Sequence, residues 1–135
     1  MSPTGGRALL ALASLFGATG VALGALGAHA LRGALGADAG AVWQTATLYH
    51  LLHAVALLVV ALTALRAGTA GLRTSALHLA GWAFAAGIVL FCGSLYLLAL
   101  DGPRWLGPVT PVGGVAFIAG WLALLLAGVR GDGLR

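Results

Sequence analysis

Hydrophobic positions along the chain fall into four long runs that contain no charged residue. An α-helix needs about 20 residues to cross roughly 30 Å of hydrocarbon, and each run is longer than this. None of the runs alternates strictly between apolar and polar residues, so the pattern does not indicate a half-buried strand or a β-barrel. The pattern therefore predicts four membrane-spanning helices. The charge-free runs cover residues 8–31, 39–65, 74–100 and 105–129.

The connections between these runs are short, so helices that are neighbours in sequence must run antiparallel. We therefore expect an all-α integral membrane protein, a four-helix antiparallel transmembrane bundle that forms one four-span domain over residues 1–135. The expected helices cover residues 8–31, 41–65, 76–100 and 110–129.

The composition agrees with a protein that has lipid as its solvent. Hydrophobic residues make up 61% of the chain and charged residues only 7%, against about 25% charged residues in an ordinary soluble domain. The formal charge of +4 does not indicate nucleic-acid binding, because there is no basic run and the arginines flank apolar segments. The single cysteine, Cys92, excludes an intramolecular disulfide and a metal site built from several cysteines.

The distribution of arginines predicts the orientation in the membrane. Five of the seven lie in the N-terminus, the second connection and the C-terminus, which share one side of a four-span protein. Arg32 and Arg104 lie in the other two connections, where Asp38 and Asp101 balance them. By the positive-inside rule both termini are cytoplasmic, an N-in/C-in topology. The five arginines are Arg7, Arg66, Arg73, Arg130 and Arg135.

The first run has a second interpretation as a cleaved signal peptide. Arg7 would supply the basic start, and Ala28, His29 and Ala30 resemble a cleavage site. However, the run 8–31 is far longer than the 7–15 apolar residues of a signal peptide, which favours a retained helix.

Glycines mark the faces on which the helices are expected to pack. Lipid supplies no hydrophobic drive for helix association, so small residues that allow close contact define the interfaces. Steps of three, four and three residues place four glycines on one face of the first helix, and other glycines gather on the fourth helix. The partner of each face lies either within the chain or in a second copy. These packing glycines are Gly17, Gly20, Gly24, Gly27, Gly113, Gly114 and Gly120.

Histidines are the candidate functional residues, because ionisable side chains inside a membrane are costly. His50 and His53 share one face of the second helix, and His29 lies at the outer edge of the first. Neutral imidazole binds zinc, copper and haem iron, so an outward-side pocket with His29 and His53 is one hypothesis. The other is that the histidines are neutral and form hydrogen bonds between helices.

Other polar side chains lie at a similar depth but cannot all converge on one point. Tyr49 lies one turn from His53, whereas Ser94 and Tyr96 of the third helix point in nearly opposite directions. Thr110 precedes Pro111 and is the natural N-cap of the fourth helix.

Four segments in order along the chain are similar to one known family. They are GALGAHAL (24–31), YHLLHAVALL (49–58), LFCGSLYLLAL (90–100) and TPVGGVAFIAGW (110–121). Together they resemble the DUF423 family, that of YgdD and the transmembrane protein 256-like small membrane proteins. The resemblance implies a multi-pass protein of the bacterial inner membrane and supplies no catalytic mechanism. Its pattern matches at His29, His53, Ser94, Tyr96, Thr110, Pro111, Gly113 and Gly114, whereas at His50 some relatives carry another polar residue.

Two hypotheses for the function follow. The first is a non-enzymatic accessory or assembly component of a larger membrane complex. Such a protein would have no cofactor and no catalytic residue. Its partners would be the lipid bilayer and other membrane subunits or copies of itself. The alternative is a protein that binds a cofactor or small molecule (haem, copper, zinc or a lipid) in the His29/His53 pocket. An enzyme is disfavoured because the apolar runs contain no acid to pair with a base.

Overall fold

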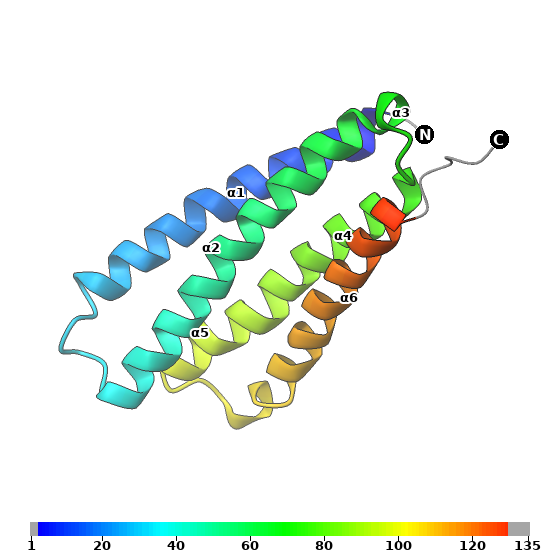
Figure 1. The fold of residues 1–135 in the computed structure, drawn as a ribbon. Coiled ribbons are helices and arrows are strands. Elements are labelled where there is room, and N and C mark those ends of the chain that lie inside the picture. The colour runs from blue at the N-terminus through cyan, green and yellow to red at the C-terminus, as the bar shows by residue number, and fades with distance from the viewer. Residues whose placement is uncertain (1–2, 130–135) are drawn as a thin grey trace.

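Four long helices form the chain in the computed structural model, which describes residues 3–129 (Figure 1). All regular elements of this part are helical, and four spans are long and apolar enough to cross a membrane, which confirms the predicted fold class. The elements are α1 (Pro3–Ala28), α2 (Ala37–Leu65), α3 (Ala67–Ala70), α4 (Thr74–Gly87), the π-helical segment η1 (Ile88–Cys92), α5 (Gly93–Ala99), the 3₁₀ turn η2 (Arg104–Leu106) and α6 (Val109–Val129).

The spans pack as two antiparallel pairs that meet along α2. The helix α1 lies along α2, and α6 lies along α4 and η1, while α2 also contacts α4, η1 and α5. Figure 1 shows the start of α1 and the end of α6 at the same end of the bundle. The side on which this end lies stays a prediction from the arginines, of which Arg130 and Arg135 fall outside the described residues.

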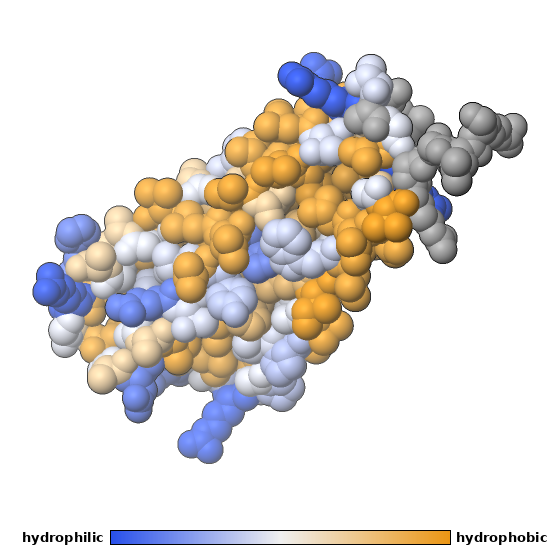
Figure 2. All heavy atoms as spheres, in the orientation of Figure 1, coloured by the Kyte–Doolittle hydropathy of each residue, from blue (hydrophilic) through white to orange (hydrophobic). Residues whose placement is uncertain are grey.

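The surface of the bundle has the polarity of a membrane protein. Figure 2 shows apolar side chains over the middle of one face and hydrophilic ones gathered at its two ends. Large apolar side chains along the middle of the helices, such as Leu52, Val55 and Ile118, are more than half exposed. In water such a surface would drive aggregation, whereas in a bilayer it faces hydrocarbon.

Three of the four glycines in the predicted stripe on α1 are used for packing within the chain. A Cβ atom added to Gly20 would lie 2.7 Å from Leu51 Cδ2, and one on Gly27 would overlap the Trp43 indole. At Gly24 the nearest atom, Thr47 Cγ2, lies 3.0 Å away. The stripe therefore packs on α2 and is not free for a second copy. Gly17, the fourth, has nothing within 4 Å of an added Cβ atom and lies apart from this contact.

The glycines of α6 bring it close to α4 and η1. A Cβ atom on Gly113 would overlap the backbone nitrogen of Phe91, and one on Gly120 would lie 2.6 Å from Phe84 Cδ1. Gly114 is different, because the nearest atom to its added Cβ is Phe91 Cδ2 at 3.8 Å, an ordinary contact. Gly113 and Gly120 thus serve contacts within the chain as well.

The third span is not the continuous α-helix that the pattern predicts. It begins at Thr74, widens into the π-helical segment η1 over Ile88–Cys92 and ends at Ala99. A π-helical turn adds one residue to the turn and so changes which side chains face each neighbour. Glycines flank it at Gly87 and Gly93, and its residue Phe91 is the one that meets Gly113. Hydrophobic periodicity carries no signal for a single π-helical turn.

The helix ends also differ from the charge-free runs. The helix α1 already includes Arg7, and α2 begins at Ala37 with Asp38 in its first turn. An aspartate near the free N–H groups of a helix start is favourable, so a charge does not end a helix there. By contrast, α1 ends at Ala28, before the end of its charge-free run, and the residues from His29 onward form turns.

Candidate functional site

His50 and His53 lie inside the bundle, whereas His29 does not. The two histidines of α2 are 4% and 3% exposed. His29 is exposed in the turn that follows α1, and it is not among the side chains that contact His53. The structure therefore does not bring together the pair on which the pocket hypothesis rests. Instead, His50 and His53 belong to two separate polar clusters on different sides of α2.

The first cluster joins α1, α2 and α5 through His50. Its Nδ1 atom lies 2.9 Å from the Tyr96 hydroxyl, and its Nε2 atom lies 3.3 Å from Thr19 Oγ1. Tyr96 also lies 3.5 Å from the Thr47 hydroxyl. Nearby, the Trp43 indole N–H donates to the carbonyl of Leu23 on α1 at 2.9 Å. These contacts connect three helices on the side of the bundle away from α6.

The neighbours of His50 indicate which of its ring nitrogens carries hydrogen. The Thr19 hydroxyl donates to the Leu15 carbonyl at 3.0 Å, so the Thr19 oxygen is left to accept the Nε2–H of His50. The Nδ1 atom then accepts the one hydrogen of the Tyr96 hydroxyl at 2.9 Å, in preference to the longer contact of 3.5 Å in which this hydroxyl would donate to Thr47. His50 is thereby a neutral imidazole with both nitrogens used between helices.

Tyr96→Phe should lower the free energy of unfolding by about 1 kcal/mol, because it leaves the Nδ1 atom of His50 without a donor inside the bundle. Tyr49→Phe is the matched control, since the Tyr49 hydroxyl makes no hydrogen bond to the described part of the chain. Unfolding by a denaturing detergent, followed by circular dichroism, measures both variants. Equal losses in the two would show that the bond between His50 and Tyr96 contributes nothing.

The second cluster joins α2, α4 and α6 through His53. Its Nδ1–H donates to the carbonyl of Tyr49, one turn earlier, at 2.9 Å. Its Nε2 atom accepts the indole N–H of Trp121 at 3.1 Å. The ring stacks on Phe117 with centroids 3.7 Å apart and meets the edge of Phe84 at 5.5 Å. With a hydrogen on Nδ1 and a lone pair on Nε2, His53 is a neutral imidazole. Both of its nitrogens are hydrogen-bonded, and its ring packs against Phe84 and Phe117.

Ser94 forms a third, smaller contact with α6. Its hydroxyl donates to the Phe91 carbonyl at 3.0 Å and lies 2.6 Å from the Thr110 hydroxyl, which donates to it. Because α6 begins at Val109, Thr110 lies in its first turn and bonds to another helix, where the sequence predicted an N-cap. Ser94 thus faces α6 while Tyr96 faces α2, in agreement with their predicted opposite directions.

This arrangement suits the connection of helices better than the binding of a metal. Each ring nitrogen of His50 and His53 already has a partner within the chain, so a metal or haem would have to displace one of them. The described residues contain no group of three or more metal-binding side chains. The sequence did not single out Trp121, Thr19 or Thr47, because hydropathy does not show which helix a side chain meets.

Comparison with known proteins gives consistent relatives. The DUF423 family, described as a protein of unknown function, matches residues 23–114. UPF0382 membrane protein YwdK of Bacillus subtilis is 46% identical over 110 residues, covering 82% of this chain and 86% of the relative. UPF0382 membrane protein SERP0230 of Staphylococcus epidermidis is 41% identical over 124 residues, covering 92% of this chain and 97% of the relative. No solved structure matches the chain significantly.

These relatives are bacterial proteins whose names describe them as membrane proteins, and the four apolar helices fit a multi-pass protein of the bacterial inner membrane. The family match covers more than half of the chain, and the segments that carried the resemblance lie largely within it. The chain therefore belongs to the DUF423 family of membrane proteins.

Proposed function

We propose that the chain is a non-enzymatic accessory or assembly component of a larger membrane complex, and that it binds a transmembrane helix of another subunit. The proposed contact is a groove of about 390 Å³ between α1 and α2, which we call the Gly17 groove. It lies midway along α1, at the depth of the hydrocarbon, where an apolar helix is a suitable occupant. It is lined by Ala13, Ser14, Gly17, Ala18, Val21, Leu51, Ala54, Val55 and Leu58.

The observation that carries the proposal is the open space at Gly17. The other glycines of the stripe are in contact with α2, whereas a Cβ atom on Gly17 would meet nothing within 4 Å. A glycine inside a helix costs about 1 kcal/mol relative to alanine, and no close contact with the described residues offsets that cost at this position. The floor beside it is made of small side chains, including the buried Ala13 and Ala54. Such a floor lets a second helix backbone approach closely in lipid.

The use of the histidines supports the non-enzymatic part of the proposal. The contacts of His50 with Thr19 and Tyr96, and of His53 with Trp121, each connect different helices. Hydrogen bonds of this kind stabilise helical membrane proteins without any chemistry. The cofactor hypothesis needs His29 beside His53, and His29 lies exposed in the turn after α1.

Gly17→Leu should remove the chain from its complex while leaving its own fold intact. The new side chain fills the groove, and because no atom lies within 4 Å of its Cβ, stability should change by about 0.5 kcal/mol or less. The measurement is native electrophoresis of membranes solubilised in mild detergent. Ala22→Leu is the matched control, since Ala22 is exposed on the same helix but does not line the groove.

Two results would contradict this proposal. One is a wild-type chain that migrates as a 13.4 kDa monomer from gently solubilised membranes, and the other is a Gly17→Leu chain that keeps its complex. Co-purification of two differently tagged copies tests the occupant. If the complex contains only copies of this chain, the groove serves self-association and the accessory role is wrong.

A further inference from the structure

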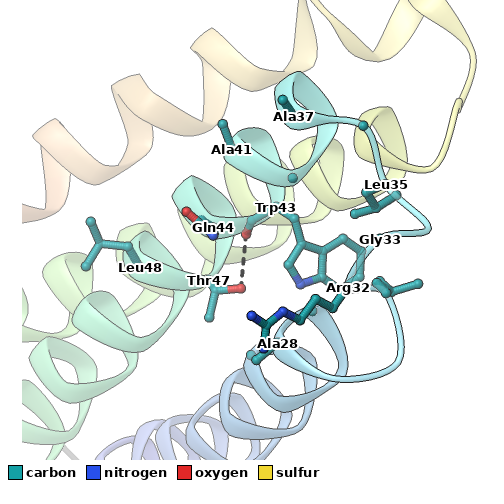
Figure 3. A pocket seen from close by; sticks show the side chains of 15 residues that line it. Ala28, Arg32, Gly33, Leu35, Ala37, Ala41, Trp43, Gln44, Thr47 and Leu48 are labelled. Atoms are coloured by element: carbon teal, nitrogen blue, oxygen red, sulfur yellow. Dashed lines mark hydrogen bonds between the residues drawn. The ribbon is translucent and has the colours of Figure 1, made fainter.

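A second cavity opens at the end of the bundle opposite the start of α1, and we call it the Arg32 mouth. It has a volume of about 580 Å³ and is enclosed by the last turn of α1, the turns that follow it and the first three turns of α2. Figure 3 shows the Arg32 side chain extending across the end of α1 toward Thr47, with Gln44 and Leu48 on the facing helix. Arg32 makes no ion pair with any described residue, so its charge is available to a ligand.

A third cavity, the aromatic groove, lies deeper in the bundle between α2, η1 and α6. It has a volume of about 610 Å³, and its walls are almost entirely apolar. The ring of Tyr49 packs on Phe91 at 4.8 Å, and Phe117 stacks on His53, so rings form its base. Its outer lip is Leu48, Val115 and Ile118, each more than 60% exposed to lipid. The groove is lined by Leu48, Tyr49, Leu52, His53, Phe91, Pro111, Gly114, Val115, Phe117, Ile118 and Trp121.

The mouth and the groove meet at Leu48, which lines both of them. At 1.5 Å per residue, the mouth extends along α2 for about 18 Å from Gly36 to Leu48. The groove then follows α6 for about 15 Å from Pro111 to Trp121. The positive charge of Arg32 therefore lies at the end of the bundle, and the two cavities lie next to each other at the exposed side chain of Leu48.

We propose that the mouth and the groove together bind one anionic phospholipid. The phosphate lies at Arg32, with the Gln44 amide as a second donor, and an acyl chain passes Leu48 into the aromatic groove. Charge selects the headgroup, because a guanidinium forms strong charge-assisted hydrogen bonds with phosphate oxygens. The apolar groove, which is lined by aromatic rings, favours an acyl chain. This site is separate from the Gly17 groove, so the proposal of a lipid site is independent of the proposed function.

The test is native mass spectrometry of the protein in mild detergent, titrated with phosphatidylglycerol or with zwitterionic phosphatidylethanolamine. Arg32→Gln should lower the affinity for phosphatidylglycerol about fivefold and leave the affinity for phosphatidylethanolamine unchanged. One arginine near an anionic membrane surface contributes about 1 kcal/mol, which corresponds to about this change in affinity. Arg104→Gln is the matched control, because Arg104 is exposed in the other connection at this end and does not line the mouth.

A second variant tests the apolar half of the site. The Cβ atom of a residue at position 114 has only an ordinary contact at 3.8 Å, so Gly114→Leu should fold and place its side chain in the groove. We expect it to lose both phospholipids, whereas Gly128→Leu, on the same helix but outside the groove, keeps them. The melting temperature of each variant confirms that it is folded.

Three outcomes would overturn the proposal. Equal phosphatidylglycerol affinities for Arg32→Gln and Arg104→Gln would exclude the mouth as a headgroup site. Undiminished lipid binding by folded Gly114→Leu would exclude the groove as a site for the chain. Displacement of the lipid by inorganic phosphate at equal concentration would show a site for a free anion instead.

Discussion

Gly113→Ala should be among the most destabilising single substitutions in the bundle, although it adds only one methyl group. The new Cβ atom would overlap the backbone nitrogen of Phe91 and lie 2.7 Å from its Cα atom. A side chain can rotate away from such a contact, but a backbone inside the π-helical segment η1 can yield only if α6 moves. Overpacking of this kind costs about 3 kcal/mol where the neighbours cannot adjust.

Gly114→Ala is the control for this prediction, because it makes the same change at the next residue of the same helix. Its Cβ atom would lie 3.8 Å from Phe91, so there is no overlap to relieve. Alanine is also a better helix former than glycine, and we expect an unchanged or slightly higher stability, by up to about 1 kcal/mol. Denaturing-detergent titration measures both variants. If they lose stability equally, α6 does not lie against the backbone of η1.

The sequence predicted the spans well because their signal is local. Charge-free runs of more than 20 residues require helices in lipid, whatever their neighbours. The opposite directions of Ser94 and Tyr96 were also predictable, since they depend only on the turn of one helix. Neither prediction needs knowledge of which helix lies beside which.

The parts that the sequence could not predict depend on contacts between helices. Gly20 and Gly24 indicate a packing face, but only the bundle shows that this face meets α2. The sequence predicted that His29 and His53 lie at the same side of the membrane, yet α1 ends before His29 and leaves it in an exposed turn. Trp121 is 46% exposed, and its indole N–H nevertheless bonds to His53.

His53→Ala should lower the free energy of unfolding by about 3 kcal/mol, while His29→Ala changes it by about 0.5 kcal/mol or less. The imidazole of His53 is buried and stacks on Phe117 at 3.7 Å, so its loss leaves a cavity between α2, α4 and α6. It also leaves the Trp121 N–H without an acceptor, and lipid offers none. The exposed His29 has no comparable contact within the bundle.

The contribution of the hydrogen bond is separated from that of packing by a double-mutant cycle with Trp121→Phe, which removes the indole donor and keeps a ring. In this background His53→Ala should cost about 1 kcal/mol less than in the wild type, the range measured for hydrogen bonds between membrane helices. A coupling near zero would mean that the bond between His53 and Trp121 is not formed in the bilayer.

Metal and haem content, measured on the same purified proteins, decides between a structural and a ligand-binding histidine. Stoichiometric metal or haem that disappears with His53→Ala would favour the cofactor hypothesis over the accessory role.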